Sequence, residues 1–323
     1  MRCVSTTDPS VAASALSQGH VAVIPTETVY GIGAVADDPV AVARVFAIKG
    51  RPVDHPLIAH VANADAARSW AAQIPGYAEP LMARFWPGPM TLVFLRSARA
   101  ADYLTGGQDS VAVRVPGSPV AREVLRALAA IKGDPAVAVA APSANRFGRV
   151  SPTTAQHAAE ELGDLLDDSD VLLDAGPCVV GVESTIVDCT GDRPVVLRPG
   201  KVTAQEITEA TGLALGERSD VRAPGTLAAH YSPQATVSII ESTAGVTIDD
   251  DSRTGLIALA SEPTPTGAIR LCAPHTNDEY AASLYRALRE ADSLRLTQVL
   301  AVAPQGDGVA EAIRDRLQRA AAG

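Results

Sequence analysis

One stretch near the N-terminus carries the pattern that decides the fold: residues 21–51, VAVIPTETVYGIGAVADDPVAVARVFAIKGR. The apolar run Val21–Ile24 predicts a short buried strand. Asp38 and Pro39 then predict the N-cap and first residue of a helix, which has an apolar stripe and ends at Gly50. A strand followed by a capped helix is the repeating unit of an α/β fold.

The same alternation continues through the first two thirds of the chain. Helix start and stop patterns alternate with short β-branched runs. The further predicted helices are 8–19, 118–130 and 153–162, and the further predicted strands are 91–95, 111–115, 137–140, 185–187 and 195–197. We therefore expect an α/β domain over residues 1–215.

A change in composition follows this domain. Residues 216–236 are rich in Pro, Gly and polar side chains and predict a linker. Beyond it, the predicted order is strand, strand, helix, strand, helix, over residues 237–240, 255–259, 278–291, 299–302 and 309–321. This order predicts a smaller, Rossmann-like open-sheet α/β domain over residues 237–323. The length of 323 residues agrees with two domains at roughly 100–200 residues each.

The charge balance restricts the class of protein. The chain has 27 Lys and Arg residues against 37 Asp and Glu residues, which gives a net charge of −10. A protein that coats nucleic acid needs many cations to neutralise phosphates, so this balance argues against that class. The acidic stretches 160–174 and 249–251 are interpreted as solvated faces or turns.

The cysteines, histidines and apolar runs predict a cytoplasmic protein without a structural metal. The four cysteines are far apart and form no C-x-x-C pair, so we interpret them as free thiols. The six histidines show no metal-binding spacing. No run reaches the ~18–20 apolar residues of a membrane span, and the first residues lack the apolar core of a signal peptide.

Neither of the two common phosphate-binding motifs is complete. Gly31-Ile32-Gly33 lacks the third glycine of the dinucleotide fingerprint, and residues 176–181 are followed by Val182-Glu183 where a P-loop needs Lys-Ser/Thr. A bound phosphate would therefore need side-chain cations and loop amides. The segment 49–60, KGRPVDHPLIAH, supplies such cations, although a polar surface loop explains its spacing equally well.

Polar residues also follow two predicted strands. The segment 25–31, PTETVYG, opens directly after the first strand, at the position where α/β sheets usually bind ligands. The hydroxyl-rich segment 141–153 follows another strand, although Ser151 or Thr153 can instead cap the next helix. Arg114 lies within an apolar strand and needs either a protein carboxylate or an anionic ligand as its partner.

Taken in order, these segments resemble the YrdC-like threonylcarbamoyl-AMP synthases. The matching motifs are PTETVYG at 25–31, KGRP at 49–52, HPL at 55–57, WPGP at 86–89 with Thr91, VRVP at 113–116, PSAN at 142–145, SPT at 151–153, ESTI at 183–186 and RPG at 198–200. HYSP at 230–233 and GVAEAIRDRL at 308–317 resemble the long, two-domain branch of this family.

The resemblance implies a fold and an activity. The fold would be a twisted open α/β sheet with a positively lined cavity. The activity would be that of a nucleotidyltransferase that forms threonylcarbamoyl-AMP and pyrophosphate from L-threonine, bicarbonate and ATP, with Mg²⁺ accompanying the ATP. The product would pass to a tRNA threonylcarbamoyl transferase. Because charge develops on phosphates, positioned cations would matter more than a covalent nucleophile, and no catalytic nucleophile or protein metal ligand is expected.

The resemblance also assigns ligands to individual residues. The residues implied to bind threonine are Thr28, His60, Arg114, Ala141 and Ser184. The residues implied to bind ATP are Lys49, Arg51, His55, Ser110, Ser143, Ser151, Arg198 and Tyr231. Because Tyr231 belongs to the linker, the linker would act as a lid over the nucleotide.

Two other readings of the sequence remain. The first is a double-stranded-RNA-binding module without adenylate synthesis, which the net charge of −10 disfavours but a local basic cavity would permit. The second is a carbamoyl-transfer enzyme of hydrogenase maturation, which carries a related domain. That enzyme is much longer and has zinc-binding C-x-x-C modules, which this chain lacks.

Overall fold

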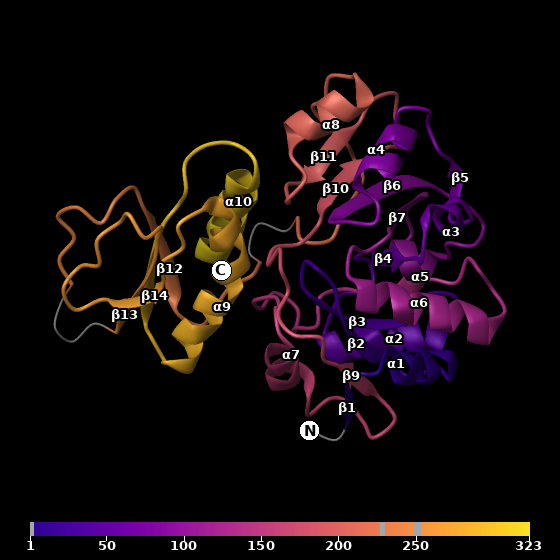
Figure 1. Cartoon of the computed structure of the whole chain (residues 1–323), viewed down its shortest axis with the longest axis horizontal. Helices are drawn as coiled ribbons and strands as arrows, with labels where there is room; N and C mark the ends of the chain where they lie inside the picture. Colours follow the sequence, from indigo (N-terminus) through magenta and orange to yellow (C-terminus); the bar gives the residue numbers. More distant parts are fainter. Residues whose placement is uncertain (1–2, 227–229, 249–252) are drawn as a thin grey trace.

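The computed structural model describes residues 3–226, 230–248 and 253–323, which form two domains side by side (Figure 1). The acidic triplet 249–251 and residues 227–229 of the predicted linker lie outside the described residues. No helix or strand is assigned to residues 216–226 and 230–235 of that linker.

The first domain is a mixed α/β structure. Its strands are β1 (Val4–Thr6), β2 (Ala22–Pro25), β3 (Tyr30–Val35), β4 (Ile58–His60), β5 (Ala71–Gln73), β6 (Met90–Arg96), β7 (Ser110–Arg114), β8 (Val139–Ala140), β9 (Val171–Leu173), β10 (Thr185–Asp188) and β11 (Val195–Arg198). Its helices are α1 (Pro9–Ser17), α2 (Pro39–Lys49), α3 (Ala64–Arg68), α4 (Ala78–Phe85), α5 (Asp102–Thr105), α6 (Pro119–Lys132), α7 (Ala155–Leu162) and α8 (Ala204–Thr211).

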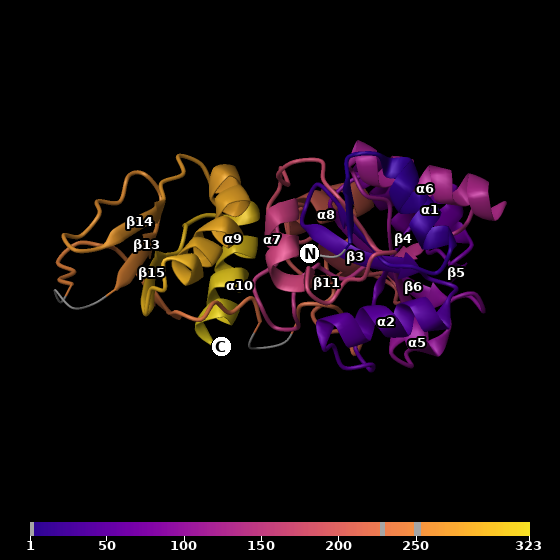
Figure 2. The same cartoon turned by 90° about the horizontal axis from the view of Figure 1, so that it is seen from below.

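These strands form one open sheet in the order β1-β9-β2-β3-β8-β4-β7-β6-β10-β11, and β5 pairs with β6. The pairing is mixed: β2 is antiparallel to β3, for example, whereas β4 is parallel to β7. Helices α1 and α6 cover one face, and α2 and α5 lie on the other (Figure 2). The expected open α/β sheet is thereby confirmed.

Helix α6 illustrates why the sequence folds as it does. Its buried residues Ala121, Val124, Leu125 and Leu128 recur at helical spacing, so one face packs on the sheet. The Ser118 side chain caps the start by accepting a hydrogen bond from the Ala121 amide at 3.2 Å. Strong local signals of this kind explain why α6 was predictable, whereas α3, α4, α5 and α8 were not predicted.

The prediction that residues 160–174 form a solvated face or turn is wrong in part. Strand β9 lies inside the stretch 160–174, and its residues are buried. Asp170 is buried too, where it accepts hydrogen bonds from both terminal nitrogens of Arg44 at 2.5 Å and from the Val21 amide at 3.1 Å. The ion pair ties α2 to the sheet, and this pairing has no local sequence pattern.

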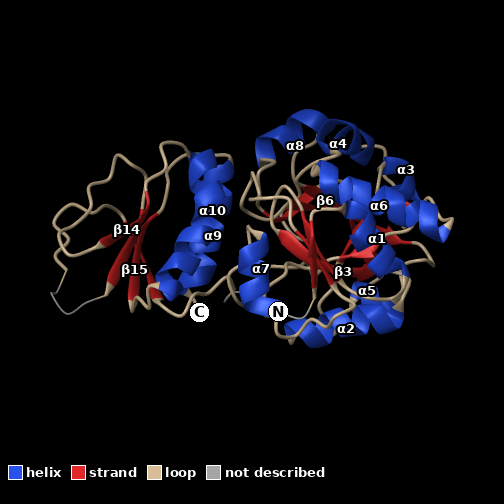
Figure 3. Ribbon diagram, turned by 60° about the horizontal axis from the view of Figure 1, so that its bottom comes forward, coloured by secondary structure: helices blue, strands red, loops and turns tan. Residues whose placement is uncertain are grey.

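The second domain has a small parallel sheet. Its elements are β12 (Thr236–Ile240), β13 (Thr254–Ile257), β14 (Ile269–Cys272), α9 (Asn277–Ser293), β15 (Gln298–Val302) and α10 (Val309–Ala321). The strand order is β12-β15-β13-β14, and every pair is parallel. Helices α9 and α10 stand between this sheet and the first domain (Figures 1 and 3).

The two domains share a hydrophobic core. Val29, Val150 and Val182 of the first domain belong to the same buried cluster as α9 and α10. At Gly181, where φ is +79°, an added Cβ would lie 2.4 Å from the Cα of Ala282, so only glycine permits this approach. The domains are therefore in direct, buried contact around Gly181.

Replacement of the buried Asp170 tests the corrected view of the acidic stretch. Asp170→Ala should lower the free energy of unfolding by about 3 kcal/mol, because Arg44 and the Val21 amide lose their partner. Urea unfolding measures this change. Asp168→Ala, two residues away on the exposed surface, is the control and should stay within about 0.5 kcal/mol of the wild type. Equal effects of the two substitutions would contradict the assignment.

Candidate active site

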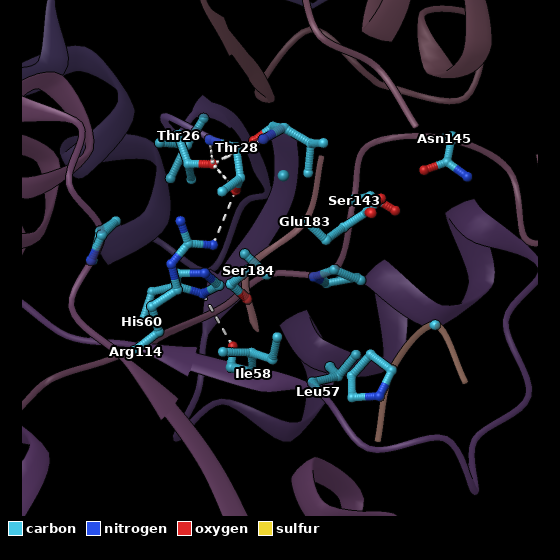
Figure 4. A pocket seen from close by; sticks show the side chains of 18 of the residues that line it. Thr26, Thr28, Leu57, Ile58, His60, Arg114, Ser143, Asn145, Glu183 and Ser184 are labelled. Carbon is cyan, nitrogen blue, oxygen red and sulfur yellow. Dashed lines mark hydrogen bonds between the residues drawn. The ribbon is translucent and has the colours of Figure 1, made fainter. Parts of the chain in front are cut away.

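A pocket opens where several strands of the first domain end and the linker crosses them (Figure 4). The polar residues that line it come from the β2–β3 turn, the end of α2, strands β4, β7 and β11, the loop after β8, the start of β10 and the linker. They are Thr26, Thr28, Lys49, Arg51, His60, Arg114, Ser143, Asn145, Glu183, Ser184, Arg198, His230 and Tyr231.

Arg114 lies at the end of β7, inside the pocket wall. Its Nη2 forms an ion pair of 2.6 Å with Glu27, its Nη1 donates to the Thr28 hydroxyl at 3.0 Å, and its Nε donates to the Gly88 carbonyl. A protein carboxylate is thus a partner of the buried charge, which is one of the two alternatives that the sequence left open. Burial raises the pKa of Glu27, but the Arg114 charge together with hydrogen bonds from Arg114 and the backbone holds that pKa below its usual value.

His60 faces the pocket beside Arg114, with which it pairs across strands β4 and β7. Its Nδ1 lies 3.2 Å from the Ile58 carbonyl. Because a carbonyl can only accept, Nδ1 carries the proton and Nε2 is left as an acceptor. Burial and the nearby Arg114 charge lower the pKa of His60 to about 3, so the ring is neutral at physiological pH.

Hydroxyl groups complete this end of the pocket. The Thr28 hydroxyl lies 2.8 Å from that of Thr26 in the β2–β3 turn (Figure 4). The Ser184 hydroxyl lies 2.7 Å from that of Thr91. Ala141 lies on the pocket wall as well. The structure therefore brings together all the residues to which the resemblance assigned threonine.

The cations of the site lie at its other end, and backbone carbonyls hold them. Lys49 Nζ donates to the carbonyls of Ser143 and Asn145. Arg51 Nη2 donates to the Pro56 carbonyl at 3.0 Å. Burial and the mutual repulsion of the two cations lower the pKa of Lys49 well below its usual value. Burial also lowers the pKa of Arg51 to about 10.

Arg198 anchors the linker to the sheet. Its Nε and Nη2 donate to the Ser184 carbonyl at 3.1 and 2.9 Å, and its Nη1 donates to the Pro224 carbonyl at 2.9 Å. The side chain is buried, and burial lowers its pKa from the usual value. Arg198 thus supplies a further buried positive charge to the pocket wall, beside Ser184.

Three residues to which the resemblance assigned ATP lie outside the pocket wall. The ring of His55 packs edge-on against Phe147, with centroids 5.3 Å apart. Ser110 begins β7, four residues before Arg114, which places it about 13 Å away at the rise of an extended strand. It lines a separate surface hollow with Asp188 and Arg218. Ser151 is fully buried and donates to Glu183 Oε1 at 2.7 Å.

Sequence reasoning did not assign a role to several residues of the wall, of which Glu183 is the most informative. Its carboxylate accepts hydrogen bonds from Ser151, from the Tyr285 hydroxyl at 2.8 Å and from Arg316 Nε at 2.9 Å. Glu183 belongs to the ESTI motif at 183–186 and directly precedes a buried strand, so its charge could have indicated a role in the site. Its partners come from α9 and α10, however, and no local pattern identifies them.

The linker closes the pocket with Tyr231, which is buried despite a positive φ of 62°. A Cβ added at Gly225 would lie 2.4 Å from the Tyr231 hydroxyl, so glycine leaves room for this side chain. The other linker residue on the wall is His230.

Among the described residues, four buried polar atoms of the pocket wall have no hydrogen-bond partner in the protein. They are Arg51 Nε, Asn145 Oδ1, His230 Nδ1 and the Tyr231 hydroxyl. A buried polar group without a partner costs about 1–3 kcal/mol, and a polar ligand removes this cost. The wall therefore fits a polar, anionic ligand.

The described residues contain no group of His, Cys, Asp or Glu side chains that could hold a metal ion. The carboxylates nearest the pocket, Glu27 and Glu183, are both paired with arginines. The pocket wall itself carries the cationic side chains of Lys49, Arg51, Arg114 and Arg198. No helix among the described residues is long and apolar enough to cross a membrane.

Comparisons with known proteins identify the family of this chain. Residues 14–200 match the family profile described as Telomere recombination, and residues 202–322 match the profile described as Threonylcarbamoyl-AMP synthase, C-terminal domain. The chain is 36% identical to a threonylcarbamoyl-AMP synthase of Pyrococcus abyssi, over 96% of this chain and 93% of the relative. It is 34% identical to the synthase of Bacillus subtilis, over 99% of this chain and 95% of the relative.

A solved structure extends the likeness to three dimensions. The crystal structure of P. abyssi Sua5 complexed with L-threonine matches this chain with a TM-score of 0.86 and 33% identity, covering 99% of this chain and 98% of the other. Because both sequence profiles and nearly full-length relatives match, the chain belongs to the threonylcarbamoyl-AMP synthase family, in the form with an additional C-terminal domain.

Proposed function

We propose that this chain is an L-threonylcarbamoyladenylate synthase, a nucleotidyltransferase that converts L-threonine, bicarbonate and ATP into threonylcarbamoyl-AMP and pyrophosphate. The observation that carries the proposal is one pocket with Arg114, His60 and Thr28 at one end and Lys49 and Arg51 at the other. The names of the nearly full-length relatives and the L-threonine bound to the P. abyssi protein support it.

The Arg114 end of the pocket suits an amino acid. Three N–H groups of Arg114 are used by Glu27, Thr28 and Gly88, which leaves one N–H on each terminal nitrogen for a carboxylate. The free Nε2 of neutral His60 can accept a hydrogen bond from the amino group. An uncharged amine is needed because its nitrogen lone pair must attack the carbon of bicarbonate.

The Lys49 end suits a triphosphate. In the adenylation step, a carbamate oxygen attacks the α-phosphorus of ATP and pyrophosphate leaves with the electron pair. Lys49, Arg51 and Arg198 are already fixed by carbonyls, so they can stabilise the developing charge without rearrangement. Mg²⁺ would enter with ATP on phosphate oxygens and water, since both nearby carboxylates are paired with arginines.

The linker covers the pocket and can therefore protect a product that reacts with water. Threonylcarbamoyl-AMP is a mixed anhydride that water hydrolyses, so solvent exclusion preserves it. Tyr231 is buried over the pocket, and Pro224 is held by Arg198. We infer that residues 216–236 act as a lid over ATP and product.

The product would be consumed in the cytoplasm by a tRNA threonylcarbamoyl transferase. Direct binding of double-stranded RNA is the alternative. Binding that weakens steeply with salt and persists when ATP fills the pocket would favour that alternative.

The central experiment measures pyrophosphate release from ATP in the complete reaction and with threonine or bicarbonate omitted in turn. The proposal expects release only when both are present, because the carbamate is the nucleophile. Release that ignores either omission would refute the synthase assignment.

Removal of Arg114 should separate threonine use from ATP binding. Arg114→Ala is combined with Glu27→Gln, so that no buried carboxylate is left unpaired. The KM for threonine should rise about 100-fold with loss of a charge-assisted pair, while the Kd for ATP should change less than about threefold. Arg126→Ala, on the exposed face of α6, is the control. Equal loss of both substrates would contradict the role.

The buried neutral His60 predicts a pH dependence of stability. Its pKa is about 3 when folded, below the ordinary value of 6.5, so the unfolded chain binds the proton more readily. The His60 contribution is complete above about pH 6.5 and is lost as the pH falls toward 3, by up to about 1.4 kcal/mol per pH unit. Urea unfolding between pH 7 and 4 should show a shallower pH slope for His60→Gln. Identical slopes for variant and wild type would exclude this burial effect.

A further inference from the structure

A buried polar cluster joins the second domain to the pocket. It consists of Glu183 from the first domain, Tyr231 from the linker, Tyr285 from α9 and Arg316 from α10, which we call the Glu183 cluster. All four side chains are buried, and Arg316 and Tyr285 are 0% exposed. Glu183 and Tyr231 also line the pocket, whereas Arg316 and Tyr285 do not.

Arg316 contacts three separate segments of the pocket wall. Its Nε donates to Glu183 Oε2 at 2.9 Å, and its Nη2 donates to the Pro199 carbonyl at 3.1 Å, next to Arg198. Its guanidinium lies over the ring of Tyr231, 5.2 Å from the centroid. One side chain of α10 thus fixes the start of β10, the end of β11 and the linker.

Tyr231 is held between the domains. Its ring stacks on Tyr285 at 5.5 Å, while its hydroxyl lies in the pocket close to Gly225. The neighbouring amide of Ser232 donates to the Gly148 carbonyl at 3.1 Å, and the amide of His230 donates to the Arg319 carbonyl at 3.3 Å. The position of the linker therefore depends on contacts with both domains.

We propose that Arg316 is a positioning residue for the active site, through which the C-terminal domain fixes Glu183 and places Tyr231 over the nucleotide. This role rests on the proposed function. Arg316 does not line the pocket, and it acts through the two residues that it holds. The second domain thereby supports two residues of the pocket wall without lining the pocket itself through Arg316.

The electrostatics of Glu183 agree with this role. Burial raises its pKa, but the charges of Arg316 and Arg198 together with hydrogen bonds from Ser151 and Arg316 lower the pKa to about 2. The other groups that face the carboxylate are the hydroxyls of Ser151 and Tyr285, with His230 and Tyr231 of the linker nearby. Without Arg316, this pKa should rise.

The test compares Arg316→Met with Arg316→Lys and with Asp278→Asn in the full-length protein. Asp278→Asn is the matched control, because it breaks the exposed Lys201–Asp278 ion pair between the domains without touching the Glu183 cluster. The first measurement is hydrogen exchange of the backbone amides in residues 230–236. Arg316→Met should accelerate exchange there by about tenfold or more, and Asp278→Asn should not.

The second measurement is the pH profile of kcat/KM for ATP. Arg316→Met should lower kcat/KM by about 10- to 100-fold and move the acid limb upward by about one pH unit or more. Arg316→Lys keeps the charge, so its acid limb should stay near that of the wild type while amide exchange still rises. A role in folding alone would not separate the Arg316→Met and Arg316→Lys variants in this way.

Unchanged amide exchange and unchanged kinetics in a folded Arg316→Met protein would overturn the proposal. If Arg316→Met does not melt cooperatively, Tyr285→Leu takes its place, because it removes the stacked ring while Glu183 keeps its arginine. It should also accelerate exchange in residues 230–236, and normal protection there would overturn the proposal. A wild-type protein that makes no product would refute the synthase assignment, while the exchange measurement still decides the role of Arg316.

Discussion

The structure depends on keeping positive charge buried beside a pocket. Lys49, Arg51 and Arg198 are nearly inaccessible to solvent, and each must be solvated by the protein itself. Backbone carbonyls do this, at Ser143 for Lys49 and at Pro56 for Arg51, for example. Because those carbonyls belong to loops that follow different elements, each cation fixes a loop relative to α2 or β11. The hydrogen bonds that replace water around the buried cations therefore also determine the shape of the cavity.

Two buried ion pairs complete this arrangement at opposite walls. Arg114 with Glu27 fixes the wall that we assign to the amino acid, and Arg316 with Glu183 fixes the wall nearest the linker. A buried ion pair contributes little net stability, because desolvation offsets the attraction, but breaking one side is costly. Such pairs select one arrangement of the wall over others. Here they select the arrangement in which the linker and the second domain close the pocket.

Six helices were predictable because their signals are local, whereas α3, α4, α5 and α8 were not predicted. Asp38 accepts hydrogen bonds from the Val40 and Ala41 amides, and Gly50 adopts the left-handed conformation that ends α2. The short strands were harder. Strand β4 has three residues, too few to show a period of two, and β9 lies within an acidic stretch. Motif order placed most of the assigned residues on the pocket wall, but it also assigned Ser110, which lies at the far end of β7.

The sequence by itself determined six of the helices (α1, α2, α6, α7, α9 and α10), the α/β class and the residue types available for chemistry, because caps, periodicity and motif order act over short distances. Only the tertiary structure decided which charges meet. Arg114 pairs with Glu27 across 87 positions and Arg316 with Glu183 across 133, and neither spacing has any periodic relation to a helix or a strand. Such pairs form where packing brings two elements together, because a buried charge is stable only beside a compensating partner.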